Sequence, residues 1–208
     1  MLKKTVLTFA FLTILTTFYG FNAQFSTPVT DDMLLNDDAA DFGNSLLGEG
    51  DYVISAYDNV IRNISEKEGH DWRLMSAIAY HESRFTPDIT SRSGARGLMQ
   101  ITEETFDWIK LKIAPSEDLT FDDLYDPETN IRFGTYFVSY CLLRYHDDLA
   151  TAAAAYHSGW GTVDNLLSQA EYSSDGETLD HYPYPQMRLY VRKITNSYQR
   201  YQDIYNEK

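Results

Sequence analysis

The sequence contains a single cysteine, Cys141, among its 208 residues. One thiol cannot form a disulfide within the chain, so the fold does not depend on cross-links. Cys141 lies in the apolar stretch YFVSYCLLRY, and we expect a small buried hydrophobe there, not a catalytic thiol. Hydrophobic residues make up 43% of the chain, enough for a core that holds without cross-links.

Basic residues are scarce. The chain has 17 Lys and Arg against 31 Asp and Glu, which gives a formal net charge of -14. Phosphate affinity comes from Lys and Arg, so this balance argues against nucleic acid as a partner. It also argues against docking on anionic lipid. We interpret the acidic clusters as solvated surface.

Metal-binding motifs are also missing. The five histidines are residues 70, 81, 146, 157 and 181, and no pair has the H-E-x-x-H spacing of a zinc helix. We therefore expect no catalytic metal and no cofactor.

No apolar run reaches the roughly 20 residues of a transmembrane helix. The longest, from Val6 to Tyr19, follows Lys3 and Lys4, a pattern typical of a secretory signal. We predict a signal peptide over residues 1–23 and export to the periplasm or cell envelope. An uncleaved N-terminal anchor stays open because Phe21 fits badly at a cleavage site, and a buried core helix is a further alternative.

Residues 24–50, rich in Asp and Gly, read as an acidic flexible linker before a folded domain at 51–208.

The sequence shows no convincing strand alternation and no internal repeat, so we expect a mainly α fold. The first helix is expected within residues 52–69 and the second from an Asp71 N-cap to about Arg84. The remaining helices are expected at Leu98–Ile113, Asn130–Tyr145, Asp148–Tyr156 and Val163–Gln169, and a final helix is expected after Pro183 and Pro185, to about Tyr205.

Glu82 stands out on the second of these helices. Leu74, Ile78 and Glu82 are spaced by four, so the carboxylate projects from the apolar face. Desolvation and the negative end of the helix dipole both disfavour its ionised form. A carboxyl that stays protonated near neutral pH is what a general acid needs. The alternative is a solvated Glu, or one paired with Arg84 or Arg92.

Four motifs follow one another along the chain. They read ESRFTP with SRSGARGLMQ at residues 82–100, DPETNIRFGTYF at 126–137, AAAAYHSGWGTV at 152–163 and PYPQMRLYVRKI at 183–194. As a set, they resemble the lytic transglycosylase domain of the soluble type, which belongs to the lysozyme-like superfamily.

The resemblance implies a lysozyme-like α-helical domain that acts, as a monomer, on the glycan strands of peptidoglycan. Such enzymes cleave between N-acetylmuramic acid and N-acetylglucosamine without water and leave a 1,6-anhydro end. It implies Glu82 and Tyr156 as catalytic residues, with Tyr156 hydrogen-bonded to Glu82. The implied substrate-binding residues are Ser91, Ser93, Gly97, Met99, Gln100, His157, Trp160, Tyr182 and Tyr190. Trp160 and Tyr182 are equally compatible with core positions.

Most glycosidases need two carboxylates, and no second acid stands out within these motifs. Substrate assistance removes that need: the N-acetyl oxygen attacks the anomeric carbon while Glu82 protonates the leaving oxygen. The chain also departs from the family pattern. His157 and Ser158 replace Asn and Ala, and Gln186 and Met187 replace Glu and Thr. Two alternatives stay open: a hydrolytic muramidase similar to goose-type lysozyme, and a catalytically silent wall-binding or assembly module.

Overall fold

The structure is a computed structural model that describes residues 55–205. The predicted signal peptide and the predicted linker lie outside the described residues. Within these residues the chain forms helices and no named strand, which confirms the mainly α prediction. The helices are α1 (Asp58–Lys67), α2 (Trp72–Ser83), α3 (Glu103–Ile113), the 3-10 helix η1 (Phe121–Tyr125), α4 (Pro127–Arg144), α5 (Leu149–Ser158), α6 (Trp160–Leu167) and α7 (Pro185–Ile204). None of these helices is long and apolar enough to cross a membrane.

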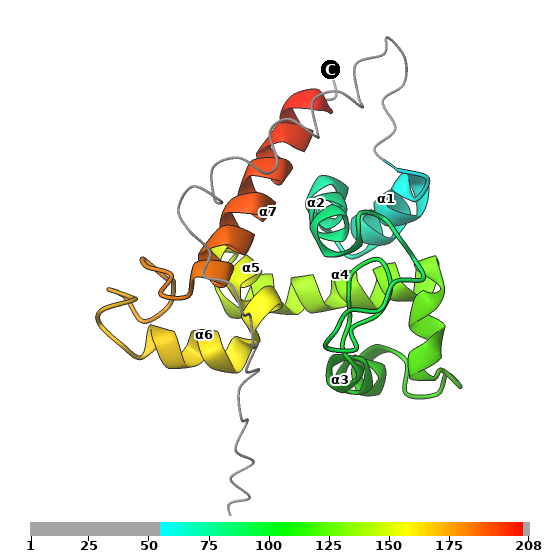
Figure 1. Cartoon of the computed structure of the whole chain (residues 1–208), viewed down its shortest axis with the longest axis horizontal. Helices are drawn as coiled ribbons and strands as arrows, with labels where there is room; N and C mark the ends of the chain where they lie inside the picture. Colours follow the sequence, from blue (N-terminus) through cyan, green and yellow to red (C-terminus); the bar gives the residue numbers. More distant parts are fainter. Residues whose placement is uncertain (1–54, 206–208) are drawn as a thin grey trace, which may run out of the picture.

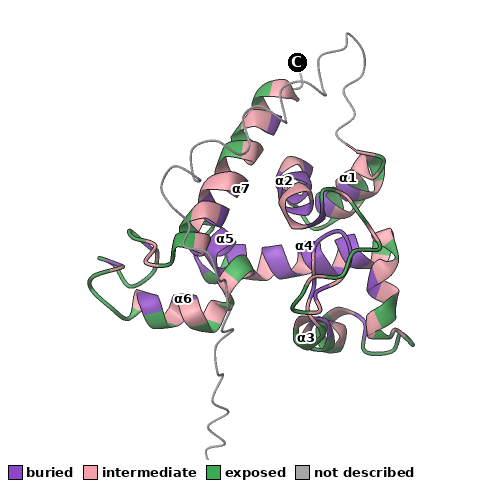
Figure 2. Ribbon diagram, in the orientation of Figure 1, coloured by how far each residue is buried: buried purple, intermediate pink, exposed green. Residues whose placement is uncertain are grey.

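Helix α4 crosses the middle of the molecule, with α1 and α2 on one side of it and α3 on the other (Figure 1). Helix α5 packs against α4 and α7, and α7 extends from α5 to α2. Burial is concentrated on α4, α5 and α2 (Figure 2). Cys141 on α4 is fully buried as expected, and this burial raises the pKa of its thiol to about 12.

Short polar side chains fix where the helices begin. The predicted N-cap Asp71 accepts a hydrogen bond from the Arg73 backbone N–H at 2.9 Å. Asp126 and Asp148 cap α4 and α5 in the same way. Each cap satisfies one of the backbone N–H groups that the first turn of a helix leaves unpaired.

The helix predicted from Leu98 begins five residues later, at Glu103, so that part of the prediction is wrong. Gly97 and Gln100 have φ angles of 74° and 50°, which a right-handed helix cannot contain. Residues 98–101 instead form a buried turn, and isolated β-bridges join Arg96 to Thr90 and to Ile101. Packing of this turn on the domain outweighs its local helical pattern.

The side chain of Asn130, at the start of α4, holds this turn in place. Its Nδ2 donates to the carbonyls of Arg96 at 2.9 Å and Leu124 at 2.8 Å. Its Oδ1 accepts from the Met99 backbone N–H at 2.7 Å. Asn130 is fully buried, so these three bonds replace water entirely.

Two glycines let the turn and α4 approach this closely. A Cβ on Gly97 would lie 2.1 Å from Asn130 Nδ2, and one on Gly134 would lie 2.3 Å from Met99 Sδ. Both distances are below any real contact, so larger residues would push the turn away from α4.

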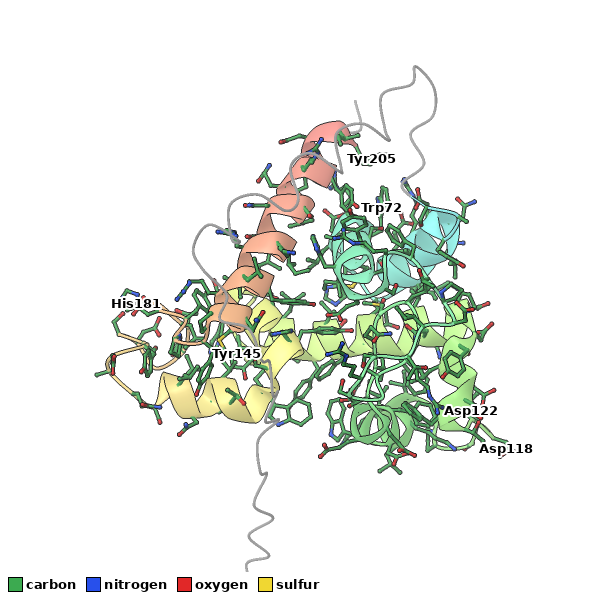
Figure 3. The ribbon with its side chains drawn as sticks, viewed as in Figure 1. Trp72, Asp118, Asp122, Tyr145, His181 and Tyr205 are labelled. Atoms are coloured by element: carbon green, nitrogen blue, oxygen red, sulfur yellow. The ribbon has the colours of Figure 1, made fainter. Side chains whose placement is uncertain are left out.

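The far end of α7 is tied to the start of α2. The rings of Trp72 and Tyr205 meet edge to face with centroids 5.3 Å apart (Figure 3). The Tyr198 hydroxyl donates to Asp71 Oδ2 at 2.9 Å, and Arg73 Nη1 donates to the Tyr205 carbonyl at 3.2 Å. These contacts hold α2 and α7 in a fixed relation to each other.

We expect Asn130→Ala to lower the free energy of unfolding by at least about 3 kcal/mol, because each buried backbone group left unpaired costs about 1–3 kcal/mol. Urea denaturation at neutral pH measures the change. The matched control is Asn165→Ala on an exposed position of α6, for which we expect a change within about 0.5 kcal/mol. Equal stability of the two variants would mean that Asn130 does not hold the turn.

Candidate active site

Glu82 lies in the last turn of α2, which ends at Ser83. The chain leaves the helix through Arg84 and Phe85, which have positive φ angles of 52° and 58°. Two consecutive non-glycine residues in this region carry backbone strain. The Ser83 hydroxyl donates to the Leu98 carbonyl at 2.8 Å, so the strained end of α2 is attached to the turn that Asn130 holds.

The Glu82 carboxyl accepts a hydrogen bond of 2.6 Å from the Tyr190 hydroxyl of α7. The residue keeps some surface area, yet its carboxyl is densely surrounded by protein atoms. Desolvation raises the pKa of Glu82 from its ordinary 4.5 to about 7, although the Tyr190 bond acts in the opposite direction. A carboxyl with this pKa both donates and accepts a proton near neutral pH.

No ion pair involves Glu82 among residues 55–205, which removes the alternative of pairing with Arg84 or Arg92. The Arg84 guanidinium lies 4.0 Å from the centre of the Tyr80 ring instead. The hydrogen-bonding partner of Glu82 is a neutral phenol, since burial and the nearby Glu82 charge raise the pKa of Tyr190 well above its ordinary value.

Tyr156 does not make the hydrogen bond to Glu82 that the sequence led us to expect. Its hydroxyl donates to the Met99 carbonyl at 2.7 Å, so it supports the turn. It is nevertheless close to the acid: burial, and then the Glu82 charge, raise its pKa well above the ordinary value. Tyr190 takes the expected role. The sequence placed it among substrate-binding residues, and no local pattern distinguished the two tyrosines.

His157 joins this group from the last turn of α5. Its ring stacks on the Tyr190 ring with centroids 4.5 Å apart and planes 15° apart. Desolvation lowers the pKa of His157, so the imidazole is neutral at pH 7. Glu82, Tyr190, Tyr156 and His157 therefore form one cluster that joins α2, α5 and α7.

The two remaining aromatic candidates make no direct ring contact with this cluster among the described residues, although Phe137 packs on both Trp160 and Tyr156. Trp160 packs, half-buried, against Trp108, Phe137 and Tyr140. Tyr182 lies near Asp148 and Thr151, at the opposite end of α5 from His157. A substrate contact for either side chain stays a prediction.

The loop before α3 carries the polar candidates. The Ser91 hydroxyl accepts from the Ala95 N–H at 3.0 Å and lies 2.9 Å from the Ser93 hydroxyl. Gln100 Nε2 donates to the Gly97 carbonyl at 2.9 Å. These bonds shape the loop and leave Ser93 exposed and Ser91 and Gln100 partly exposed.

Gly97 and Met99, expected to bind substrate, both have packing roles. Both are buried, and the Met99 side chain, with no exposed surface, packs against Gly134 of α4. The motif G-L-M-Q is therefore explained largely by how the turn docks on α4. A substrate contact for Gly97 or Met99 stays a prediction.

A cavity of about 300 Å³ lies away from this cluster, between the end of α4, α6 and residues 176–177. Its charged lining includes Arg144 and Asp164, which form an ion pair with each other. We assign it no part in the chemistry at Glu82.

The raised pKa of Glu82 makes stability depend on pH. The folded protein binds this proton more tightly than the unfolded chain, so stability falls as pH rises from about 4.5 through 7. A shift from 4.5 to about 7 corresponds to at most about 3 kcal/mol. We expect Glu82→Gln to match the wild type at pH 4 and to unfold at higher temperature at pH 8.

Thermal unfolding of both proteins across this pH range measures the effect. Glu104→Gln, on the exposed face of α3, serves as the control and should give no pH-dependent gain. A constant difference between Glu82→Gln and the wild type at all pH values would contradict the raised pKa.

Comparisons with known proteins agree with this geometry. Membrane-bound lytic murein transglycosylase F of Serratia proteamaculans is 30% identical over 181 residues, which cover 77% of this chain and 35% of that protein. The chain thus spans about a third of the length of this relative.

Two solved structures share the fold. An inactive glutamate-to-glutamine mutant of lytic transglycosylase Slt from Pseudomonas aeruginosa superposes with a TM-score of 0.64 and 26% identity, over 73% of this chain and 24% of that one. The 70 kDa soluble lytic transglycosylase of Escherichia coli gives 0.65 and 25%, over 74% and 25%. The lysozyme-like fold expected from the resemblance is confirmed.

The sequence profile of the Transglycosylase SLT domain matches residues 59–178, more than half of the chain. The motifs, the helical fold around Glu82 and this match lead to one conclusion: the chain belongs to the Transglycosylase SLT domain family.

Proposed function

We propose that this domain cleaves the glycan strands of peptidoglycan between N-acetylmuramic acid and N-acetylglucosamine, without water, to leave 1,6-anhydro ends. The observation that carries the proposal is the Glu82 carboxyl, with a pKa of about 7 and a neutral phenol as its hydrogen-bonding partner. Among residues 55–205, no second carboxylate contributes to that pKa shift. A reaction that uses one group first as acid and then as base suits such a site.

In the first step, the N-acetyl oxygen of the substrate attacks the anomeric carbon. Glu82 transfers its proton to the oxygen of the leaving sugar as that bond breaks. The carboxylate left behind is stabilised by the Tyr190 hydroxyl, which donates to it at 2.6 Å. A charge-assisted bond of this kind is stronger than the bond to the neutral acid, so it favours the proton transfer.

In the second step, Glu82 takes the proton of the C6 hydroxyl. The C6 oxygen attacks the same anomeric carbon, the bond to the N-acetyl oxygen breaks, and the anhydro ring closes. Glu82 is again protonated, and no water has been consumed. We assign Ser91 the role of orienting the N-acetyl group, because its hydroxyl is partly exposed on the loop that follows Glu82. Ser93 and Gln100, on the same loop as Ser91, are the further substrate contacts that we propose.

We expect the rate on purified peptidoglycan to fall tenfold per pH unit above about pH 7, because Glu82 must be protonated at the start. Glu82→Gln should lower turnover by at least about 100-fold, the low end of general acid–base contributions. Mass spectrometry of the released fragments follows both effects. Glu104→Gln is the matched control and should retain the wild-type rate and pH profile.

The same measurement separates the alternatives. Anhydro ends, lighter by one water than reducing ends, support the proposal. Reducing ends would identify a hydrolytic muramidase. Binding to the wall without release of fragments by the wild type would identify a wall-binding module. Release by Glu82→Gln at the wild-type rate would remove Glu82 from the mechanism.

We further propose that the protein is exported and acts in the periplasm or cell envelope as a monomer. Lys3, Lys4 and the apolar run from Val6 to Tyr19 support export. We expect N-terminal sequencing of the protein from the envelope fraction to begin near residue 24. An intact Met1 on soluble cytoplasmic protein would contradict this, and an intact Met1 on membrane-bound protein would indicate an anchor.

A further inference from the structure

Tyr190 has to be held precisely to serve Glu82. Its hydroxyl reaches Glu82 Oε1 from α7 across 108 positions of sequence, and only 8% of its surface is exposed. A phenol on a helix rotates about two side-chain bonds, so the packing against its two faces decides where the hydroxyl points. The contact on one face is the His157 ring, 4.5 Å away and nearly parallel.

The contacts of His157 fit this holding role. Among the described residues, neither ring nitrogen of His157 makes a hydrogen bond, so its defined contact is the stack on Tyr190. The two rings belong to α5 and α7, which pack directly on each other. His157 is exposed, whereas the Tyr190 ring on which it stacks is buried. At this position the chain departs from the family motif, which has Asn after the tyrosine.

We propose that His157 is a positioning residue: its flat imidazole fixes the Tyr190 ring in the plane that keeps the phenol hydroxyl on Glu82 Oε1. The stack, and not a proton carried by the imidazole, is the functional part. The proposal rests on the proposed cleavage reaction for its consequence, because a fixed Tyr190 favours proton transfer by Glu82. The structural part of the proposal, that His157 holds the hydrogen bond from Tyr190 to Glu82 in place, does not depend on any activity.

The first test is the titration of Glu82, followed by NMR of its ¹³C-labelled carboxyl and assigned by the loss of signal in Glu82→Gln. The Tyr190 bond lowers the pKa of Glu82, so losing that bond should raise it. We expect a higher pKa in Tyr190→Phe and in His157→Ala, and the wild-type value in His157→Phe, which keeps a flat ring. Adding His157→Ala to Tyr190→Phe should produce no further change.

The second test is turnover on purified peptidoglycan. We expect His157→Ala to lower kcat roughly 2- to 10-fold, the range that corresponds to the coupling energy of an aromatic pair, with KM little changed. His157→Phe should restore the rate, and the double variant should be no slower than Tyr190→Phe alone. His181→Ala, an exposed position on the loop before α7 (Figure 3), is the control and should match the wild type.

The outcomes are distinguishable. An unchanged Glu82 titration in folded His157→Ala overturns the positioning role, whatever the activity. A His157→Phe variant as defective as His157→Ala overturns it as well, because the ring nitrogens would then matter. A wild-type protein that releases no fragments contradicts the proposed function and leaves the NMR result to decide the role of His157.

Discussion

The fully buried amide of Asn130 is the interaction on which the arrangement of the domain depends. It pairs with three backbone groups, from Arg96, Met99 and Leu124. The Arg96 and Met99 groups belong to a segment with no regular hydrogen-bond ladder, and the Leu124 carbonyl belongs to the short 3-10 helix η1, so a side chain has to satisfy them. The turn then accepts a bond from Ser83 at the end of α2 and one from Tyr156 of α5. Through these contacts, Asn130 fixes two of the three helices around Glu82.

The third helix, α7, balances the cost of burying the acid. Desolvation alone would raise the pKa of Glu82 further and make the carboxyl a poor proton donor. The Tyr190 hydroxyl offsets part of that cost and brings the pKa to about 7. The site is therefore poised to exchange a proton in both directions, at a cost of at most about 3 kcal/mol of stability at alkaline pH. Firm anchoring of α7 to α2 by Trp72, Tyr198 and Tyr205 fits this role.

Local sequence patterns were sufficient to predict a helix wherever its apolar residues recur with the helical period and a capping residue marks its start. The sequence around Asp71 predicts the cap of α2, and the spacing of Leu74, Ile78 and Glu82 predicts that the carboxyl lies on the buried face. The same reasoning failed at residues 98–101, where an apolar run suggested a helix. There, the positive φ angles of Gly97 and Gln100 and the contacts to α4 determine the conformation. The apolar residues of that turn are buried because the turn packs on α4. Apolar periodicity alone therefore could not distinguish a helix from a buried turn.

The sequence by itself determined the helical class and the family and singled out Glu82 as the candidate acid, because these depend on spacing within segments and on the order of motifs. Only the tertiary structure decided which tyrosine serves that acid. Tyr156 and Tyr190 both belong to motifs, and both lie close to the carboxyl. The packing of α5 and α7 directs one hydroxyl to the Met99 carbonyl and the other to Glu82. Hydrogen bonds between residues 57 and 108 positions apart depend on the orientation of whole helices, which no local pattern specifies.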